Sequence, residues 1–288
     1  RDLHYSLHSP YTTLFRSHQL NRSRLLCSHR SHFASHPGVS GVRPRANRGL
    51  WVINALALLS RSSPDCSGDG QGCPVGGRIQ WFQGAWASST SDAWVLRIVE
   101  EGYRIEFSEV PPPSGVLATP WPRDPLKQVA LEMGIQDLLM KNAISLVPRL
   151  ERSRGFFSII FLVQKVTGGF RLVLDLKRLN QYIPTVHFKM ETLQRIIPLV
   201  SQGHYMCTLD LQDAYYHVPV FPSHQQFLRF CVQGLQYQFR VLPFGLKTAP
   251  RVFTKVIAPV VASLHLEGIK VFPYLDDWLL TAPSVVQL

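Results

Sequence analysis

Two neighbouring carboxylates, Asp276 and Asp277, lie inside an apolar and aromatic run near the end of the chain. A buried carboxylate without a partner is costly, so adjacent aspartates in an apolar hairpin predict bound cations or unusually strong hydrogen bonds. A third carboxylate, Asp210, ends an apolar stretch that begins at Tyr205 and that we expect to be a buried strand. Two divalent ions about 3.5 to 4 Å apart need several converging carboxylates. The three aspartates therefore predict a divalent metal site that acts on phosphate groups.

The elements that must position these aspartates alternate between strand and helix patterns. We expect a hairpin over 156–174 turning at Gly168 and Gly169, helical stretches at 176–182 and 190–200, a strand at 205–209, a hairpin over 226–241 turning at Gly234, a helix over 247–266, and a final hairpin around Asp276. This mixed order predicts an α+β fold.

The stretch 77–150 is predicted to be a helical upstream region. Ser91 and Asp92 precede a helix over 93–101 that Gly102 ends. A proline-rich linker follows over 111–125. A second, amphipathic helix is expected over 125–144, with its apolar residues at Leu126, Val129, Ala130, Met133, Leu138 and Leu139 and an interruption at Gly134.

Residues 1–76 differ in composition, with nine arginines, no lysine and six of the eleven histidines before residue 76. No sustained hydrophobic period is present, so we interpret this low-complexity segment as largely disordered. The alternative interpretations of this segment are a basic arm for nucleic acid, a solvated tail, or translated sequence that was never selected as protein. Zinc binding by Cys27 and nearby histidines is a weaker alternative, because the standard ligand spacing is missing.

The formal net charge of +11 favours a polyanionic partner such as nucleic acid. A membrane-spanning segment is not expected, because about 18 uninterrupted apolar residues are needed and none occur. Five cysteines at irregular spacing favour a reduced intracellular setting, in the cytoplasm or the nucleus.

Four sequence blocks occur in the order found in one known family. They span 170–180, 210–219, 242–250 and the Tyr-Leu-Asp-Asp run at 274–277. Together they resemble the fingers and palm of a reverse transcriptase, whose YxDD signature the last block matches. The Tyr-Leu-Asp-Asp-Trp-Leu-Leu form and the upstream stretch 94–107 are most similar to DIRS-type retrotransposons. A retroviral or other LTR-element polymerase is the nearest alternative subfamily.

The resemblance implies an RNA-directed DNA polymerase that uses an RNA template, a DNA primer or duplex, deoxynucleoside triphosphates (dNTPs) and two Mg²⁺ ions, with Mn²⁺ as an alternative. The implied catalytic and metal-binding residues are Asp210, Asp276 and Asp277, of which Asp277 ranks third. The implied nucleotide-binding residues are Lys165, Arg171, Asp213, Ala214, Tyr215, Phe244 and Gly245. Tyr215 would lie beneath the sugar and exclude a 2′-hydroxyl, and Phe244 stands where the family often has glutamine.

The chain begins with Arg1 and stops soon after the Asp276–Asp277 pair, so we expect a fragment whose fingers and palm occupy 151–288. A catalytically inactive remnant that at most binds nucleic acid is the main alternative, and a metal phosphohydrolase is a distant third. Tyr216, His217 and Trp278 are interpreted as packing or surface residues. Lys247 is either a basic residue of the site or a lysine at the start of a helix.

Overall fold

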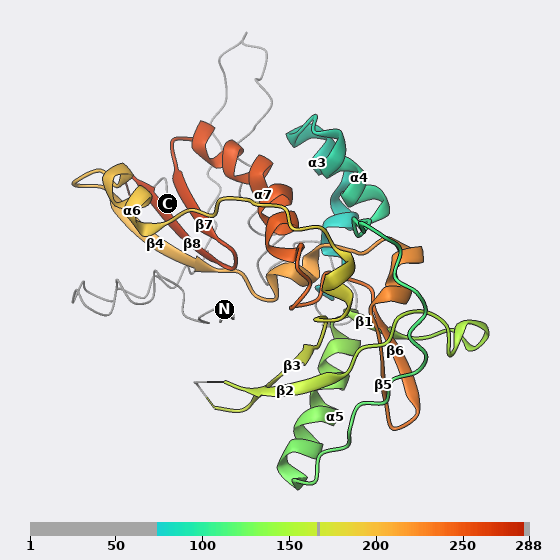
Figure 1. Ribbon diagram of the computed structural model, residues 1–288. Coiled ribbons are helices and arrows are strands. Elements are labelled where there is room, and N and C mark those ends of the chain that lie inside the picture. The colour runs from blue at the N-terminus through green and yellow to red at the C-terminus, as the bar shows by residue number, and fades with distance from the viewer. Residues whose placement is uncertain (1–73, 166–167, 285–288) are drawn as a thin grey trace, which may run out of the picture.

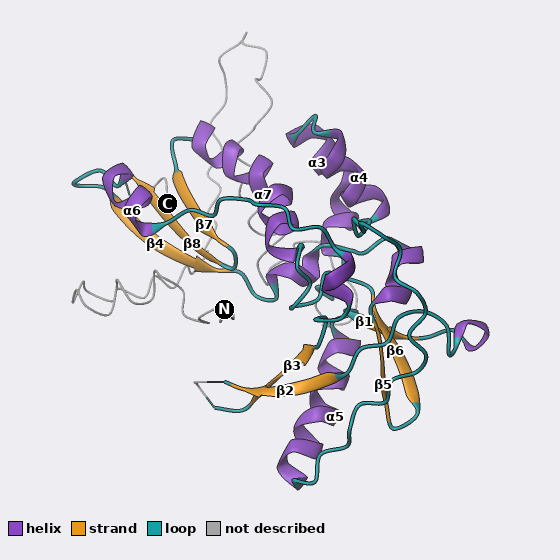
Figure 2. Ribbon diagram, in the orientation of Figure 1, coloured by secondary structure: helices purple, strands orange, loops and turns teal. Residues whose placement is uncertain are grey.

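The computed structural model describes residues 74–165 and 168–284 as short helices packed among small antiparallel sheets (Figure 1, Figure 2). The helices are α3 (Gln83–Ser89), α4 (Ala93–Glu101), α5 (Pro125–Met140), α6 (Leu193–Ile196) and α7 (Ala249–Leu266). The 3-10 turns are η1 (Arg78–Phe82), η2 (Arg149–Glu151), η3 (Leu179–Tyr182), η4 (Ile197–Leu199), η5 (Ala214–His217) and η6 (Pro222–Phe227). The strands are β1 (Ile144–Leu146), β2 (Ile160–Gln164), β3 (Phe170–Leu174), β4 (Tyr205–Asp210), β5 (Arg229–Val232), β6 (Leu235–Phe239), β7 (Lys270–Tyr274) and β8 (Asp277–Ala282).

The expected α+β class is confirmed. Residues 1–73 of the predicted low-complexity segment 1–76 lie outside the described residues. The alternative zinc site at Cys27 lies there as well. Val75, which is described, is buried in the core.

Helix α4 begins and ends at the predicted residues. The Asp92 carboxylate accepts hydrogen bonds from the Trp94 amide at 2.8 Å and the Val95 amide at 3.3 Å, which satisfies two otherwise unpaired donors. Gly102 ends the helix at φ 95°, and a Cβ there would lie 2.7 Å from the Phe221 amide nitrogen. The following residue can therefore pair with the chain near η5, where the Tyr103 amide donates to the Pro219 carbonyl at 2.7 Å.

Helix α5 differs from its prediction in its buried face and in its end. Of the expected apolar positions, Leu138 is buried, whereas Leu126, Val129 and Met133 are 75%, 53% and 68% exposed. Leu131 and Ile135, which were not among the expected positions, are buried at helical spacing with Leu138. Gly134 does not interrupt the helix. A Cβ at Gly134 would lie 2.5 Å from the Leu172 side chain, so this glycine allows α5 to pack closely on β3.

Both predicted strand hairpins of the middle region are confirmed. β2 and β3 pair antiparallel from Ile160 with Leu174 to Gln164 with Phe170. β5 and β6 turn at Gln233 and Gly234, whose φ angles of 48° and 78° suit a two-residue hairpin turn. β1, from the predicted upstream region, adds to the other edge of β6, so this sheet has the order β1-β6-β5.

The third sheet has the order β4-β8-β7 and carries the three aspartates of the predicted metal site. α7 packs against β7. The expectation that β4 is buried was wrong: Tyr205, Met206, Cys207 and Thr208 are exposed. β4 is the edge strand of this sheet, so one of its sides has no neighbouring strand among the described residues.

One hydrophobic core joins the upstream helices to the strands and to α7. Val95 and Ile98 of α4, Leu131 of α5 and Phe253 of α7 belong to the same buried cluster. Residues 77–150 therefore pack on the core that also supports residues 151–284.

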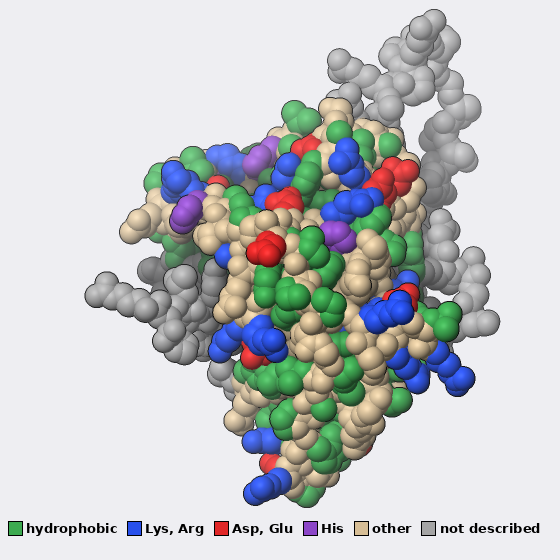
Figure 3. Space-filling view, turned by 45° about the vertical axis from the view of Figure 1, so that its right-hand side comes forward, with side chains coloured by type: hydrophobic (Ala, Val, Ile, Leu, Met, Phe, Trp, Pro, Cys, Tyr) green, Lys and Arg blue, Asp and Glu red, His purple; other side chains and the backbone are tan. Residues whose placement is uncertain are grey.

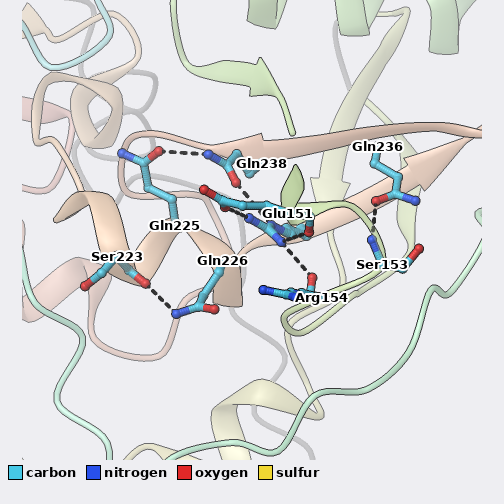
Figure 4. Close-up of polar contacts among 9 residues, drawn as sticks. Glu151, Ser153, Arg154, Ser223, Gln225, Gln226, Gln236 and Gln238 are labelled. Atoms are coloured by element: carbon cyan, nitrogen blue, oxygen red, sulfur yellow. Dashed lines mark hydrogen bonds and ion pairs between the residues drawn. The ribbon is translucent and has the colours of Figure 1, made fainter. Parts of the chain in front are cut away.

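A buried guanidinium, Arg229, fixes the exposed loop between β1 and β2. Arg229 is 1% exposed and donates to the carbonyls of Glu151 at 2.8 Å and Arg154 at 2.7 Å. It also donates to the Glu151 carboxylate at 2.5 Å and to the Gln238 amide oxygen at 3.1 Å. Figure 4 shows this network, in which glutamines of η6 and β6 extend the contacts. A buried charge needs partners of this kind.

Candidate active site

The two strand ends that carry the aspartates lie side by side. Asp210 is the last residue of β4 and pairs across the sheet with Asp277, the first residue of β8. Residues paired in this way have Cα atoms about 4.5 to 5.5 Å apart. The amide of Leu211 donates to the Asp276 carbonyl at 2.7 Å, which ties the chain after β4 to the turn before β8.

The turn between β7 and β8 consists of Leu275 and Asp276. Leu275 has a φ of 55°, an unfavourable conformation for a bulky residue. The Trp278 indole donates to the Leu275 carbonyl at 3.0 Å, and Leu275 packs against the core, so both contacts stabilise this turn. Trp278 is 1% exposed and is a packing residue, as expected. The turn thus presents Asp276 to solvent while Asp277 is half-buried.

The carboxylates carry negative charge that the surrounding protein compensates only in part. Desolvation by the protein is the main cause that raises the pKa of Asp210, and the charge of Asp277 adds to it. Desolvation also raises the pKa of Asp276, with further increases from Asp277 and Asp210 and an opposing effect from Arg171. A bound cation would relieve this repulsion.

The donors suit magnesium by their chemistry, although they do not form a closed protein cage. Within the part of the chain that the structure describes, no three His, Cys, Asp or Glu residues form a group that could hold a metal ion. Magnesium commonly uses one or two carboxylates together with water and substrate phosphate oxygens. The Asp210–Asp277 pair with the neighbouring Asp276 meets this smaller requirement.

The predicted nucleotide residues Asp213, Ala214 and Tyr215 follow β4 in one tight turn. Asp213 has a φ of 54° and precedes η5, and its carbonyl accepts a hydrogen bond from the Tyr216 amide at 2.8 Å. Ala214 and Tyr215 are buried. The Tyr215 ring lies 5.0 Å from the ring of Phe244 and 5.6 Å from that of Phe253, between centroids. Tyr215 therefore forms one wall of a packed aromatic group.

Arg171 and Phe244 connect this aromatic group to the β2–β3 hairpin. The guanidinium carbon of Arg171 lies 5.5 Å from the Phe244 ring centroid, within the range of a cation–π contact. Arg171 also acts on the pKa of Asp276 through its charge. The structure thus brings Arg171, Phe244 and Tyr215 together, and the Arg171 charge links this group to Asp276.

Gly245 follows Phe244 at a φ of 95°, and a Cβ there would lie 3.1 Å from the Leu174 carbonyl. Asn180 holds this loop from both sides. Its side chain donates to the Gly245 carbonyl and accepts from the Lys247 amide, each at 2.9 Å. The Lys247 ammonium donates to the Ile183 carbonyl at 2.8 Å, which favours the reading of Lys247 as a structural lysine.

Lys165 is exposed at the end of the β2–β3 hairpin, where its amide donates to the Gly169 carbonyl at 3.0 Å. Its neighbours 166 and 167 lie outside the described residues. The contacts that connect Arg171, Phe244 and Tyr215 do not include the Lys165 side chain.

Two residues of the site's surroundings had no assigned role in the sequence analysis. Asn180 lies in the 170–180 block, but Gly245 is 65 residues away in the sequence. Local sequence patterns therefore cannot predict their contact. Lys141, after α5, pairs with Asp213 at 3.1 Å. No spacing rule connects Lys141 with a residue of another element.

The family comparison covers the part of the chain that holds the predicted site residues. Residues 163–288 match the family described as Reverse transcriptase (RNA-dependent DNA polymerase). The chain is 26% identical over 157 residues to the Pro-Pol polyprotein of Simian foamy virus type 1, a match that covers 54% of this chain and 13% of that protein. It is also 26% identical over 198 residues to the Pol polyprotein of Equine infectious anemia virus (strain Wyoming), covering 63% of this chain and 17% of that protein.

Among solved structures, the native crystal structure of Prototype Foamy Virus Protease-Reverse Transcriptase is 24% identical, with a TM-score of 0.49, over 62% of this chain and 22% of that chain. The chain spans less than a fifth of the length of the two polyproteins. Among the described residues, no helix is long and apolar enough to cross a membrane.

Proposed function

We propose that this chain is part of an RNA-directed DNA polymerase that adds dNTPs to the end of a primer paired with an RNA template. One observation carries the proposal: Asp210 faces Asp277 across two strand ends, and the charge of Arg171 acts on the pKa of the neighbouring Asp276. All of these residues lie in the range that matches the reverse transcriptase family. Residues 151–288 would form the fingers and palm.

The three aspartates would hold Mg²⁺ ions, or Mn²⁺ in their place. Two bound ions would activate the primer 3′-hydroxyl and neutralise charge on the leaving pyrophosphate. Asp210 and Asp276 would be the main ligands and Asp277 the third. The support is that desolvation, and secondly repulsion from neighbouring aspartates, raises the pKa values of Asp210 and Asp276, because a bound cation would offset both effects.

Arg171 and Lys165 would bind the triphosphate. Arg171 suits two parallel hydrogen bonds to phosphate oxygens, whereas Lys165 acts as a single mobile charge. The contact of Arg171 with the Phe244 ring restricts the guanidinium before substrate arrives.

Asp213, Ala214, Tyr215, Phe244 and Gly245 would shape the sugar and base pocket. The Tyr215 ring is held between Phe244 and Phe253, so it cannot withdraw easily from a sugar placed above it. A 2′-hydroxyl would then clash with the ring, and deoxyribonucleotides would be preferred. Gly245 leaves space for the nucleotide and the template base.

Template and primer would be held mainly through their phosphates, as the net charge of +11 favours. On the face shown in Figure 3, Lys and Arg side chains form several separate groups. Contacts of this kind act on the shape of a duplex rather than on its sequence.

The origin of the chain belongs to the same proposal. The run 274–280 and the stretch 94–107 are the support for a DIRS-type retrotransposon, whereas the relatives reported above are retroviral polyproteins. The adjoining nucleotide sequence tests this point: a tyrosine recombinase in the same element would support a DIRS-type origin, and a retroviral integrase would contradict it. An intracellular site of action, in cytoplasm or nucleus, is the corresponding expectation.

The decisive experiment is primer extension on a primed RNA template with dNTPs and Mg²⁺. We expect extension by a protein that continues past Leu288 in its natural reading frame, and little or none by the 288-residue chain alone. Asp276→Asn should abolish extension, because it removes one carboxylate from the metal site. Glu132→Gln, an exposed carboxylate on α5, is the matched control and should leave extension unchanged.

Absence of extension by the longer protein under Mg²⁺ and Mn²⁺ would contradict the polymerase proposal. Retained binding of the primed template would then favour the alternative, an inactive remnant that binds nucleic acid.

A further inference from the structure

Lys141 forms an ion pair with a residue of the predicted nucleotide pocket. Its ammonium lies 3.1 Å from the Asp213 carboxylate and 2.6 Å from the carboxylate of Asp137, one helical turn earlier. The side chains of Lys141 and Asp213 are 24% and 19% exposed, so this pair is better shielded from water than a surface ion pair. Lys141 lies outside residues 163–288, the range of the family match.

The charge of Lys141 is stable within this arrangement. Burial by itself would lower the pKa of Lys141, but the hydrogen bonds and charges of Asp137 and Asp213 raise it overall. The ammonium therefore stays protonated at neutral pH and continues to attract Asp213.

The turn that begins at Asp213 needs an external support. A φ of 54° costs free energy for a residue other than glycine, and it persists only where surrounding contacts compensate. The carbonyl of Asp213 starts η5, since it accepts from the Tyr216 amide. Displacement of Asp213 would therefore also move Ala214 and Tyr215.

The chain before α3 adds a second support to the same place. The Gly76 amide donates to the Lys141 carbonyl at 2.8 Å, and the Gly77 amide donates to the Tyr216 carbonyl at 2.8 Å. A Cβ at Gly76 would lie 2.3 Å from the Asn142 carbonyl oxygen, so only glycine allows this approach. Lys141 and η5 are thus tied to one another through the backbone as well as through the ion pair.

We propose that Lys141 is a positioning residue for the dNTP pocket, which holds the Asp213 turn so that Ala214 and Tyr215 keep the conformation that receives the nucleotide. This inference rests on the proposed polymerase function. It assigns to Lys141, the residue after helix α5, an indirect effect on substrate binding that acts through Asp213.

Two measurements test the inference. Hydrogen exchange of peptides covering 211–218 in the 288-residue chain, without nucleotide, reports on the turn itself. Binding of dTTP with Mg²⁺ to the protein that continues past Leu288, loaded with a dideoxy-terminated primer on an RNA template, reports on the pocket. The variants are Lys141→Met, Lys141→Arg as the conservative rescue, and Lys127→Met as the control, because Lys127 is an exposed lysine of the same helix.

We expect Lys141→Met to speed exchange in 211–218 about three-fold or more and to weaken dTTP binding about five-fold. Lys141→Arg should restore most of the slow exchange in 211–218 and most of the dTTP affinity. Lys127→Met should match the unaltered protein in both measurements. Exchange outside 211–218 should change little, which separates loss of positioning from general destabilisation.

Unchanged exchange in 211–218 would overturn the inference, whatever the nucleotide result. Faster exchange with unchanged dTTP affinity would show that Lys141 holds the turn but would overturn its effect on nucleotide binding. If the unaltered longer protein binds no dTTP, the proposed function fails on that measurement, while the exchange data still decide whether Lys141 holds the turn.

Discussion

His217 allows a quantitative test of how the η5 turn is packed. It is 1% exposed, and its Nε2 lies 3.2 Å from the Gln212 carbonyl, to which a neutral ring donates. Nδ1 is buried and has no hydrogen-bond partner among the described residues. Burial and the nearby positive charge of Arg78 lower the pKa of His217 to about 4. We therefore expect the folded protein to lose stability when histidine becomes protonated in the unfolded chain.

The size of this effect follows from the two pKa values. An unfolded histidine has a pKa of about 6.5, so on acidification the unfolded chain binds a proton before the folded protein does. The contribution of His217 is complete above about pH 6.5 and is lost as the pH falls towards about 4. Between pH 7 and pH 5 this single group should remove about 2 kcal/mol from the free energy of unfolding.

Urea unfolding followed by tryptophan fluorescence at pH 7 and pH 5 measures this loss. His217→Gln keeps a side-chain donor but does not titrate. Between pH 7 and pH 5, this variant should therefore lose about 2 kcal/mol less of its free energy of unfolding than the unaltered protein does. His187→Gln, an exposed histidine, is the control and should behave as the unaltered protein does. If His217→Gln loses as much stability on acidification as the unaltered protein, within about 0.5 kcal/mol, the argument from burial is refuted.

Three further predictions concern packing and specificity. Gly102→Ala should destabilise the fold by about 2 kcal/mol or more in urea unfolding, because a Cβ meets the Phe221 backbone at a positive φ, whereas Gly84→Ala, with open space around it, should be neutral or stabilising. Arg229→Met should cost about 2 to 4 kcal/mol, since it removes the donor shared by Glu151 and Arg154; a loss below about 1 kcal/mol would contradict this role. Tyr215→Ala in the longer protein should reduce the preference for dTTP over UTP about ten-fold or more in single-nucleotide primer extension, and unchanged preference would argue against a clash with the 2′-hydroxyl.

Local signals in the sequence predicted the elements that depend on neighbouring residues. The cap at Asp92, the stop at Gly102 and the turn at Gly234 are each decided within a few residues, because capping and turn conformation are local properties. The hairpin at Asp276 was also predicted. Its turn residue Leu275 has a positive φ that its residue type does not favour, and packing and the Trp278 hydrogen bond stabilise it.

Burial was less predictable than element type. The apolar residues of α5 did not reveal which side faces the core, since exposed Leu126 and Met133 are as apolar as buried Leu131 and Ile135. β4 looks like an interior strand by composition but lies at the edge of its sheet. The exposure of these residues depends on which elements from distant parts of the chain pack against them.

The sequence by itself determined which residues are predicted to carry the chemistry: the three aspartates, the basic residues of the hairpin, and the Asp213–Tyr215 run. Their metal and nucleotide roles stay predictions until they are measured. Only the tertiary structure decided that Asp210 faces Asp277, that Arg171 lies over Phe244, and that Lys141 forms an ion pair with Asp213. These contacts join residues far apart in the chain, and such pairs form only when the whole core packs and brings their elements together.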